Sequence, residues 1–175
     1  MIISACASGW ISYGHTSHCY RHIPSRMSWD TARSYCKSIS PPGKIGDLAS
    51  VMDRNTNTFL STMTTKEVWT GGYQDGNNKW FWSDGTKLKF TAWSSGQPSG
   101  GNQKHVTINF KTPGGWNDAN ANSEREFLCQ YFTGIKLITL LPFCILYLYI
   151  RYNSFWNIFN TNTMHGYIFN NQYCS

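Results

Sequence analysis

Residues 97–118 open with Gln97-Pro98-Ser99-Gly100-Gly101-Asn102-Gln103-Lys104-His105 and close, after a run of alternating apolar and polar residues, with Gly115-Trp116-Asn117-Asp118. This pattern indicates a glycine-rich loop, then a strand, then an aromatic anchor followed by an amide and a carboxylate. Such a loop cannot build a core, so its polar side chains are free to meet a ligand. Its two ends can bring together the oxygens of Gln97, Ser99, Asn117 and Asp118, which suit a hard cation or sugar hydroxyls. The alternative is a solvated surface loop whose tryptophan belongs to the core.

The whole chain has 175 residues, a formal net charge of +6, 16% aromatic residues and only 14% charged residues. This length suits one domain with an appendage. The aromatic content can fill a core and is not typical of disorder. The positive charges are spread along the chain without a Lys/Arg run or a basic helix, so we expect no nucleic-acid partner. The charge is compatible with weak attraction to acidic glycans or anionic membranes.

Six cysteines stand at positions 6, 19, 36, 129, 144 and 174, and none belongs to a CxxC pair. Their spacing argues against a structural zinc site. The first four lie among Trp, Tyr, Gly and Asn residues and indicate two disulfides, whereas free thiols in a cytosolic protein are the alternative. We therefore expect an extracellular, secreted protein, although residues 1–5 are too short for a complete signal peptide.

Local patterns predict two helices in the first part of the chain. The first is expected over residues 28–37, with Ser28 as a candidate N-cap and Pro41-Pro42-Gly43 as the stop. The second is expected to begin after Ser50, and its buried side is predicted from Val51, Phe59, Leu60 and Met63.

The rest of this region predicts antiparallel strands. Alternating residues on both sides of Asp84-Gly85 are a strong hairpin signal, with arms at 80–83 and 86–90. Other strands are expected at 68–73, 105–110 and 126–131, and a short hairpin over 6–20. Two early helices and later antiparallel strands define an α+β domain.

In this order and spacing, the motifs resemble a C-type lectin-like domain of the long form, which we assign to residues 1–132. The resemblance is carried by Cys6-Ala7-Ser8-Gly9-Trp10, Cys19-Tyr20, Trp29, Ala32 and Cys36, Leu48-Ala49, Trp69-Thr70-Gly71-Gly72, Trp80-Phe81-Trp82-Ser83-Asp84-Gly85, Trp93, Gln97-Pro98-Ser99, Trp116-Asn117-Asp118 and Phe127-Leu128-Cys129. It implies a C-type lectin fold, with two helices, antiparallel sheets and a long ligand-binding loop region. It also implies the disulfides Cys6–Cys19 and Cys36–Cys129.

The resemblance also implies where a ligand binds. The family's sugar-binding calcium site falls on Gln97, Ser99, approximately Gln103, Asn117 and Asp118, which are the predicted ligand-binding residues. The candidate calcium ligands are Gln97, Asn117 and Asp118, but only Asp118 is a carboxylate, so calcium binding is expected to be weak or absent. The triplet Gln97-Pro98-Ser99 is like the galactose type at Gln97 only, and residues 100–104 offer no aromatic ring for stacking.

A further disulfide of the family falls on His105 and Ala121, neither of which is cysteine. Because this cross-link is missing, the loop is expected to be more mobile than is usual for the family. Three histidines around Cys19, at positions 15, 18 and 22, are interpreted as surface residues rather than metal ligands.

These observations predict a secreted lectin that binds carbohydrate or glycoprotein, with weak or absent calcium dependence and a role in pathogen recognition and innate immunity. The alternative is a calcium-independent module that binds proteins or surfaces, as venom, receptor and ice-binding relatives do. We expect no enzyme activity, because no nucleophile elbow, carboxylate pair or catalytic-cysteine context appears.

Residues 133–175 differ in composition, with an apolar stretch followed by an Asn- and aromatic-rich one. Only 14 residues lie between Lys136 and Arg151, fewer than the roughly 20 that cross a bilayer comfortably. A non-native extension is therefore preferred over a weak membrane anchor, and membrane contact is expected only if this tail anchors the chain.

Overall fold

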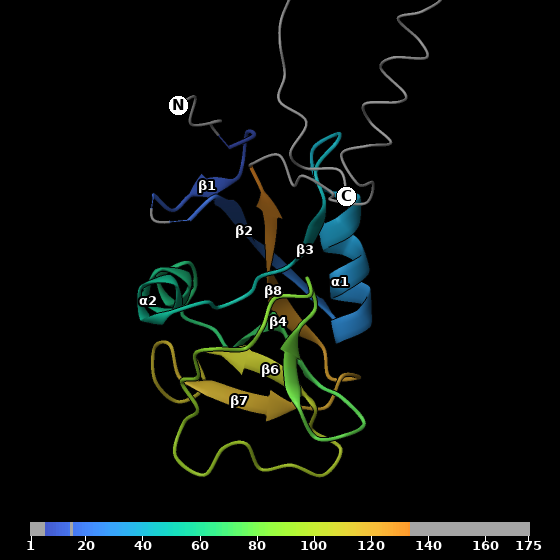
Figure 1. Cartoon of the computed structure of the whole chain (residues 1–175), viewed down its shortest axis with the longest axis vertical. Coiled ribbons are helices and arrows are strands. Elements are labelled where there is room, and N and C mark those ends of the chain that lie inside the picture. The colour runs from blue at the N-terminus through green and yellow to red at the C-terminus, as the bar shows by residue number, and fades with distance from the viewer. Residues whose placement is uncertain (1–5, 15, 134–175) are drawn as a thin grey trace, which may run out of the picture. The chain divides into compact units, whose positions relative to one another are not determined.

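The structure is a computed structural model that describes residues 6–14 and 16–133 (Figure 1). Apart from Thr133, the predictions for the tail and for Cys144 and Cys174 lie outside the described residues, as does His15. Across the described ranges, no helix is long and apolar enough to cross a membrane. The elements are β1 (Ile11–Ser12), β2 (His18–Met27), α1 (Trp29–Ser38), β3 (Gly46–Leu48), α2 (Arg54–Thr62), β4 (Val68–Gln74), β5 (Trp80–Trp82), β6 (His105–Ile108), β7 (Trp116–Ala119) and β8 (Arg125–Phe132).

The strands form one sheet in the order β1-β2-β8-β4-β6-β7, with β3 also paired to β8 and β5 to β4. All these pairs are antiparallel except β4 and β8, which run parallel where Trp69 faces Phe127. The predicted antiparallel pairing is therefore confirmed for every strand pair except this one, which makes the sheet mixed. Strands β4 and β8 are brought together by a long crossover rather than a hairpin, so their directions are not forced to alternate.

Helix α1 confirms the first predicted helix, with Trp29, Ala32 and Cys36 buried and Ser28 at its N-cap. Helix α2 begins at Arg54, later than predicted, because the Asp53 carboxylate caps it by accepting a 2.7 Å hydrogen bond from the Thr56 amide. Its buried residues are Thr56, Asn57 and Leu60, whereas Val51 is buried before the helix starts. The two helices lie on different sides of β2 and β8 (Figure 1).

The predicted hairpin around Asp84-Gly85 forms only in part. Its first arm is β5, but the second arm is reduced to an isolated bridge between Phe81 and Lys87. The Asp84 carboxylate accepts hydrogen bonds from the amide and the hydroxyl of Thr86, at 2.8 and 2.7 Å. The Trp82 amide also donates to Thr86 O at 3.4 Å across the turn, and the pairing does not continue beyond Lys87.

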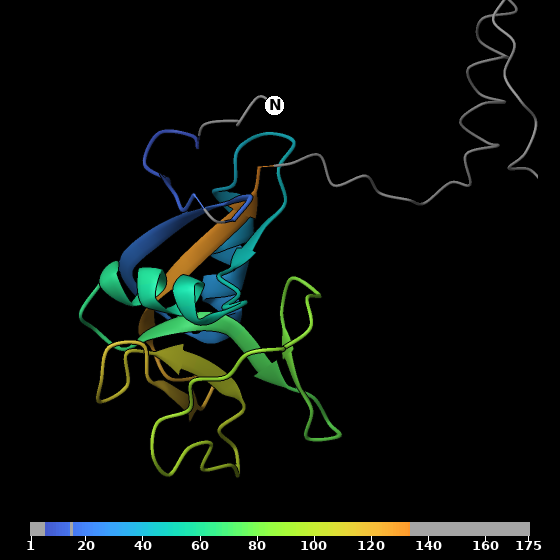
Figure 2. The same cartoon turned by 60° about the vertical axis from the view of Figure 1, so that its left-hand side comes forward.

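Two clusters of buried side chains form the core. One contains Trp29, Trp69 and Phe127 around the Cys36–Cys129 disulfide, and the other contains Trp82, Trp116 and Leu128 among its members. The second predicted disulfide, Cys6–Cys19, is also present. The long loop that precedes β6 lies at the end of the domain formed by β6 and β7, as both views show (Figure 2).

Candidate functional site

Strand β7 carries the amide and the carboxylate that the sequence singled out. It is anchored by Trp116, which is fully buried and whose indole N–H donates to the Asn57 Oδ1 of α2 at 2.8 Å. Strand β7 pairs with β6 so that Thr107 faces Asn117 and Val106 faces Asp118. Because neighbouring residues on a strand point to opposite faces, Asn117 and Asp118 have different surroundings.

The Asp118 carboxylate holds the loop that precedes β6. Oδ1 accepts hydrogen bonds from the Ser99 amide at 2.8 Å and from the Ser99 hydroxyl at 3.2 Å, and Oδ2 accepts one from the Gly100 amide at 2.6 Å. Asp118 itself is fully buried. Hydrogen bonds from backbone amides to a carboxylate are among the stronger ones in proteins, so this residue fixes the conformation of the loop.

Two other predicted site residues lie in the same loop. The Gln103 amide donates from Nε2 to the Ser99 hydroxyl oxygen at 3.0 Å, so Gln103, Ser99 and Asp118 form one chain of hydrogen bonds. The peptide between Gln97 and Pro98 is cis, and the backbone N–H of Gln97 donates to Ser94 O at 2.9 Å. The Gln97 Oε1 atom is buried and has no hydrogen-bond partner.

Asn117 does not join this group. Its Nδ2 donates to Glu67 Oε1 at 3.2 Å, and the same carboxylate oxygen accepts from the Thr107 hydroxyl at 2.6 Å. The four oxygen-bearing side chains therefore do not all meet at one point, because the strand places Asn117 on the face opposite Asp118. Sequence reasoning missed Glu67. Its only signal was a single acidic residue directly before the apolar run of β4.

The residues present do not fit a calcium site. Three N–H and O–H donors already point at the Asp118 carboxylate, and a cation would have to replace them. Asn117 is held by Glu67 on the other face, and Gln97 adds no charge. Within residues 6–14 and 16–133, no group of three or more His, Cys, Asp or Glu side chains is placed to hold a metal ion. Calcium sites need several converging oxygens, most of them anionic in tight sites.

The two positions of the missing family disulfide are packed against the start of α1. The His105 ring lies 4.5 Å from the Trp29 ring, centroid to centroid, and the Trp29 amide donates to Ala121 O at 2.9 Å. Burial of the imidazole lowers the pKa of His105. These contacts connect the loop region to α1 without a covalent bond, and the predicted mobility of the loop stays a prediction.

Comparison with known proteins agrees with this fold. Residues 25–131 match the family described as the lectin C-type domain, and the chain belongs to that family. It is 34% identical over 139 residues to a lectin of Pleurodeles waltl, which covers 73% of this chain and 77% of that protein. It is 33% identical over 139 residues to the galactose-specific lectin nattectin of Thalassophryne nattereri, which covers 72% and 80%.

Solved structures of the family include members that differ in calcium use. The C-type lectin CEL-I of Cucumaria echinata superposes with a TM-score of 0.67 at 26% identity, over 74% of this chain and 99% of that one. A Ca²⁺-dependent type II antifreeze protein in its Ca²⁺-free form has a TM-score of 0.63 at 26% identity, over 71% and 98%. A calcium-independent type II antifreeze protein shares the fold, with a TM-score of 0.65 at 22% identity, over 72% and 93%. The fold therefore serves both calcium-dependent and calcium-independent proteins.

Proposed function

We propose that the chain is a secreted lectin that binds carbohydrate, free or on a glycoprotein, through residues 97–103 and without calcium. The observation that carries this proposal is the set of three hydrogen bonds from Ser99 and Gly100 to the buried Asp118 carboxylate. A loop that a protein carboxylate already orders needs no bound cation to order it. Membership of the lectin C-type domain family and similarity to a galactose-specific lectin support carbohydrate as the ligand.

The loop offers groups that suit sugar hydroxyls. Ser99 is exposed and Gln103 is half-exposed, so their hydroxyl and amide groups can exchange their mutual hydrogen bond for bonds to a ligand. Asp118 acts behind them as the residue that positions the loop. Two disulfides support an extracellular location, where such bonds persist, and pathogen recognition in innate immunity is the setting that we propose.

A glycan array, probed with and without a chelator, tests this proposal. We expect the same glycans to be retained in both conditions. Gln103→Ala should weaken retention, whereas Asn77→Ala, which removes an exposed amide at the turn between β4 and β5, should not. Absence of any retained glycan in either condition would overturn the carbohydrate proposal. Loss of retention with the chelator alone would overturn only its calcium independence.

A second candidate function is a calcium-independent module that binds a protein or a surface. It is favoured by the same loop, because Ser99 and Gln103 are bonded to each other and residues 100–104 provide no aromatic ring. A negative glycan array, together with retained binding to a protein or a solid surface, would favour this candidate.

A further inference from the structure

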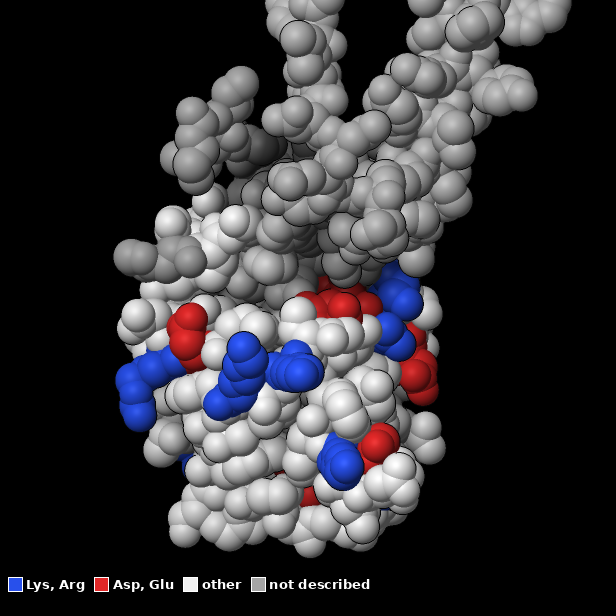
Figure 3. Space-filling model, viewed as in Figure 1, with Lys and Arg blue, Asp and Glu red and all other residues white. Residues whose placement is uncertain are grey.

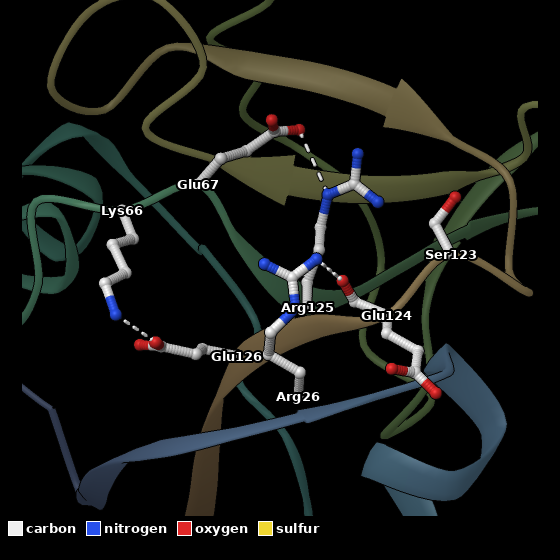
Figure 4. Close-up of a pocket in the computed structure, with 7 residues that line it drawn as sticks. All are labelled: Arg26, Lys66, Glu67, Ser123, Glu124, Arg125 and Glu126. Carbon is white, nitrogen blue, oxygen red and sulfur yellow. Dashed lines mark hydrogen bonds and ion pairs between the residues drawn. The ribbon is translucent and has the colours of Figure 1, made fainter.

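A hollow of about 520 Å³ lies on the side of the domain where β8 begins. It is built from three segments: the end of β2, the two residues before β4, and the turn that leads into β8 (Figure 4). Its size is within the usual range of roughly 300–1,000 Å³ for small-molecule sites. Its lining residues are Arg26, Lys66, Glu67, Ser123, Glu124, Arg125 and Glu126.

Glu126, one of the acidic residues of the hollow, is already bonded by two basic side chains. Its carboxylate is paired with the Lys66 ammonium through Oε1 and with His22 Nε2 through Oε2, the latter at 2.8 Å. The hydrogen bond from Lys66 is the main reason why the pKa of Glu126 lies below its ordinary value. Because Glu126 is buried and doubly bonded, it contributes little free negative charge to the hollow.

The side chains of the other two acidic residues do not bond the terminal nitrogens of Arg26 or Arg125. Glu67 Oε1 accepts hydrogen bonds from Thr107 and Asn117 and forms an ion pair with Arg125 Nε at 3.4 Å (Figure 4). The Glu124 side chain extends away from the two guanidinium groups, and only its backbone carbonyl faces Arg26 (Figure 4).

Two guanidinium groups line this hollow. Arg26 donates from Nη2 to Glu124 O at 2.7 Å, and Arg125 lies over the Trp69 ring at 4.8 Å from its centroid. Each guanidinium has five N–H donors. Among the described residues, no acceptor takes the other N–H groups of Arg26, or those on the terminal nitrogens of Arg125. The two side chains come from different strands, β2 and β8, and both line the hollow (Figure 4).

A pair of guanidinium groups recognises an anion differently from single exposed cations. On the face drawn in Figure 3, Lys and Arg side chains occur singly and in small groups, several of them beside acidic residues. Isolated exposed cations attract anions only weakly and without geometry, because water and salt screen them. Two guanidinium forks that line one hollow can instead form paired hydrogen bonds to the oxygens of one planar or tetrahedral anion.

We propose that this hollow is a second binding site, which takes the oxyanion of an acidic saccharide, either a carboxylate or a sulfate group, between Arg26 and Arg125. The Ser123 side chain on the rim can bind a neighbouring sugar hydroxyl. The site is separate from the loop site, because Asn117 faces Glu67 on this side while Asp118 faces Ser99 on the other. The choice of a saccharide as the carrier of the anion rests on the proposed lectin function.

Isothermal titration of the full chain tests this proposal with three oligosaccharides of equal length. One carries sulfate only, one carries carboxylate only, and one is a neutral galactan. We expect at least one acidic oligosaccharide to bind more tightly than the neutral one. Arg26→Gln should weaken that binding roughly tenfold, as expected for the loss of charge-assisted hydrogen bonds. The response of the two acidic oligosaccharides shows which oxyanion the site prefers.

Arg54→Gln is the matched control. It removes the same charge from an exposed position at the start of α2. It should change the affinity for the acidic oligosaccharide less than twofold, because water and salt screen an exposed charge. Equal losses for the two variants would overturn the proposal, because they would show general attraction by net charge. Equal binding of acidic and neutral oligosaccharides would overturn it as well. A different result would count against the proposed loop site. If Gln103→Ala left the binding of neutral glycans unchanged, the loop-site proposal would fail, whatever the result for the hollow.

Discussion

Ser99 and Asp118 are 19 residues apart in the chain and are joined by two hydrogen bonds, from the Ser99 amide and the Ser99 hydroxyl to the same carboxylate oxygen. The bonds connect the middle of the long loop to a strand of the sheet. A third hydrogen bond runs from the Gly100 amide to the other oxygen of the Asp118 carboxylate. The acid that would be expected to hold a cation therefore holds the protein's own backbone.

Replacement of Asp118 should loosen the loop and destabilise the domain. Asp118→Ala removes three hydrogen bonds and leaves the Ser99 and Gly100 amides without their acceptor, at a cost of about 1–3 kcal/mol. Urea unfolding measures this loss, and hydrogen exchange should show faster exchange at both amides. Asp118→Asn keeps one acceptor oxygen and should lose less. Unchanged exchange at Gly100 in the alanine variant would contradict the role that we assign to Asp118.

Calcium should not stabilise the folded domain. A ligand that binds only the folded state raises the unfolding midpoint, by an amount equivalent to about 2.7 kcal/mol at one hundred times its Kd. Because Asp118 is occupied by loop donors and Asn117 by Glu67, we expect the same midpoint with millimolar calcium and with a chelator. Thermal unfolding with magnesium serves as the control for ionic strength. A rise that saturates with calcium and is absent with magnesium would show that a calcium site forms.

The two disulfides should differ in their contribution to stability. Cys36–Cys129 spans 93 residues and Cys6–Cys19 spans 13. In the chain-entropy description, removal of the first bridge lowers the unfolding free energy by about 4–5 kcal/mol and removal of the second by about 3 kcal/mol, since a longer closed loop restricts the unfolded chain more. Paired Cys→Ala variants of each bridge, compared by denaturant unfolding, measure the difference. A larger loss for the Cys6–Cys19 pair would contradict this order.

His105 should make stability depend on pH just below neutrality. Burial lowers the pKa of His105 in the folded state, while in the unfolded chain it takes its ordinary value of about 6.5. As the pH falls, His105 therefore takes up a proton in the unfolded chain before it does so in the folded one. Its contribution to the unfolding free energy is complete above about pH 6.5 and is lost as the pH falls below that value. His105→Phe keeps an aromatic ring against Trp29 but cannot titrate. Its unfolding free energy should fall less between pH 7 and pH 5 than that of the parent chain. Parallel profiles for the two proteins would contradict the prediction.

Sequence patterns predicted the parts of the fold that depend on local chemistry. Helix α1 follows from the spacing of Trp29, Ala32 and Cys36 and from the stop at Pro41-Pro42. Helix α2 was placed too early, because Val51 is apolar and buried but lies in extended backbone before the Asp53 cap. The Asp84-Gly85 hairpin was predicted too long, since its second arm pairs only as far as the bridge between Phe81 and Lys87.

By itself, the sequence determined the class of fold, the four paired cysteines and the position of the long loop before β6, because the order and spacing of tryptophans, glycines and cysteines carry that information. Only the tertiary structure decided what each polar side chain does. Asp118 bonds to Ser99 and Gly100, Asn117 bonds to Glu67, and Arg26 and Arg125 line one hollow. These partners are distant along the chain, and strand alternation and sheet pairing bring them together. The free energy of a buried polar group depends on the partner it meets, so its role follows from the fold rather than from its neighbours in sequence.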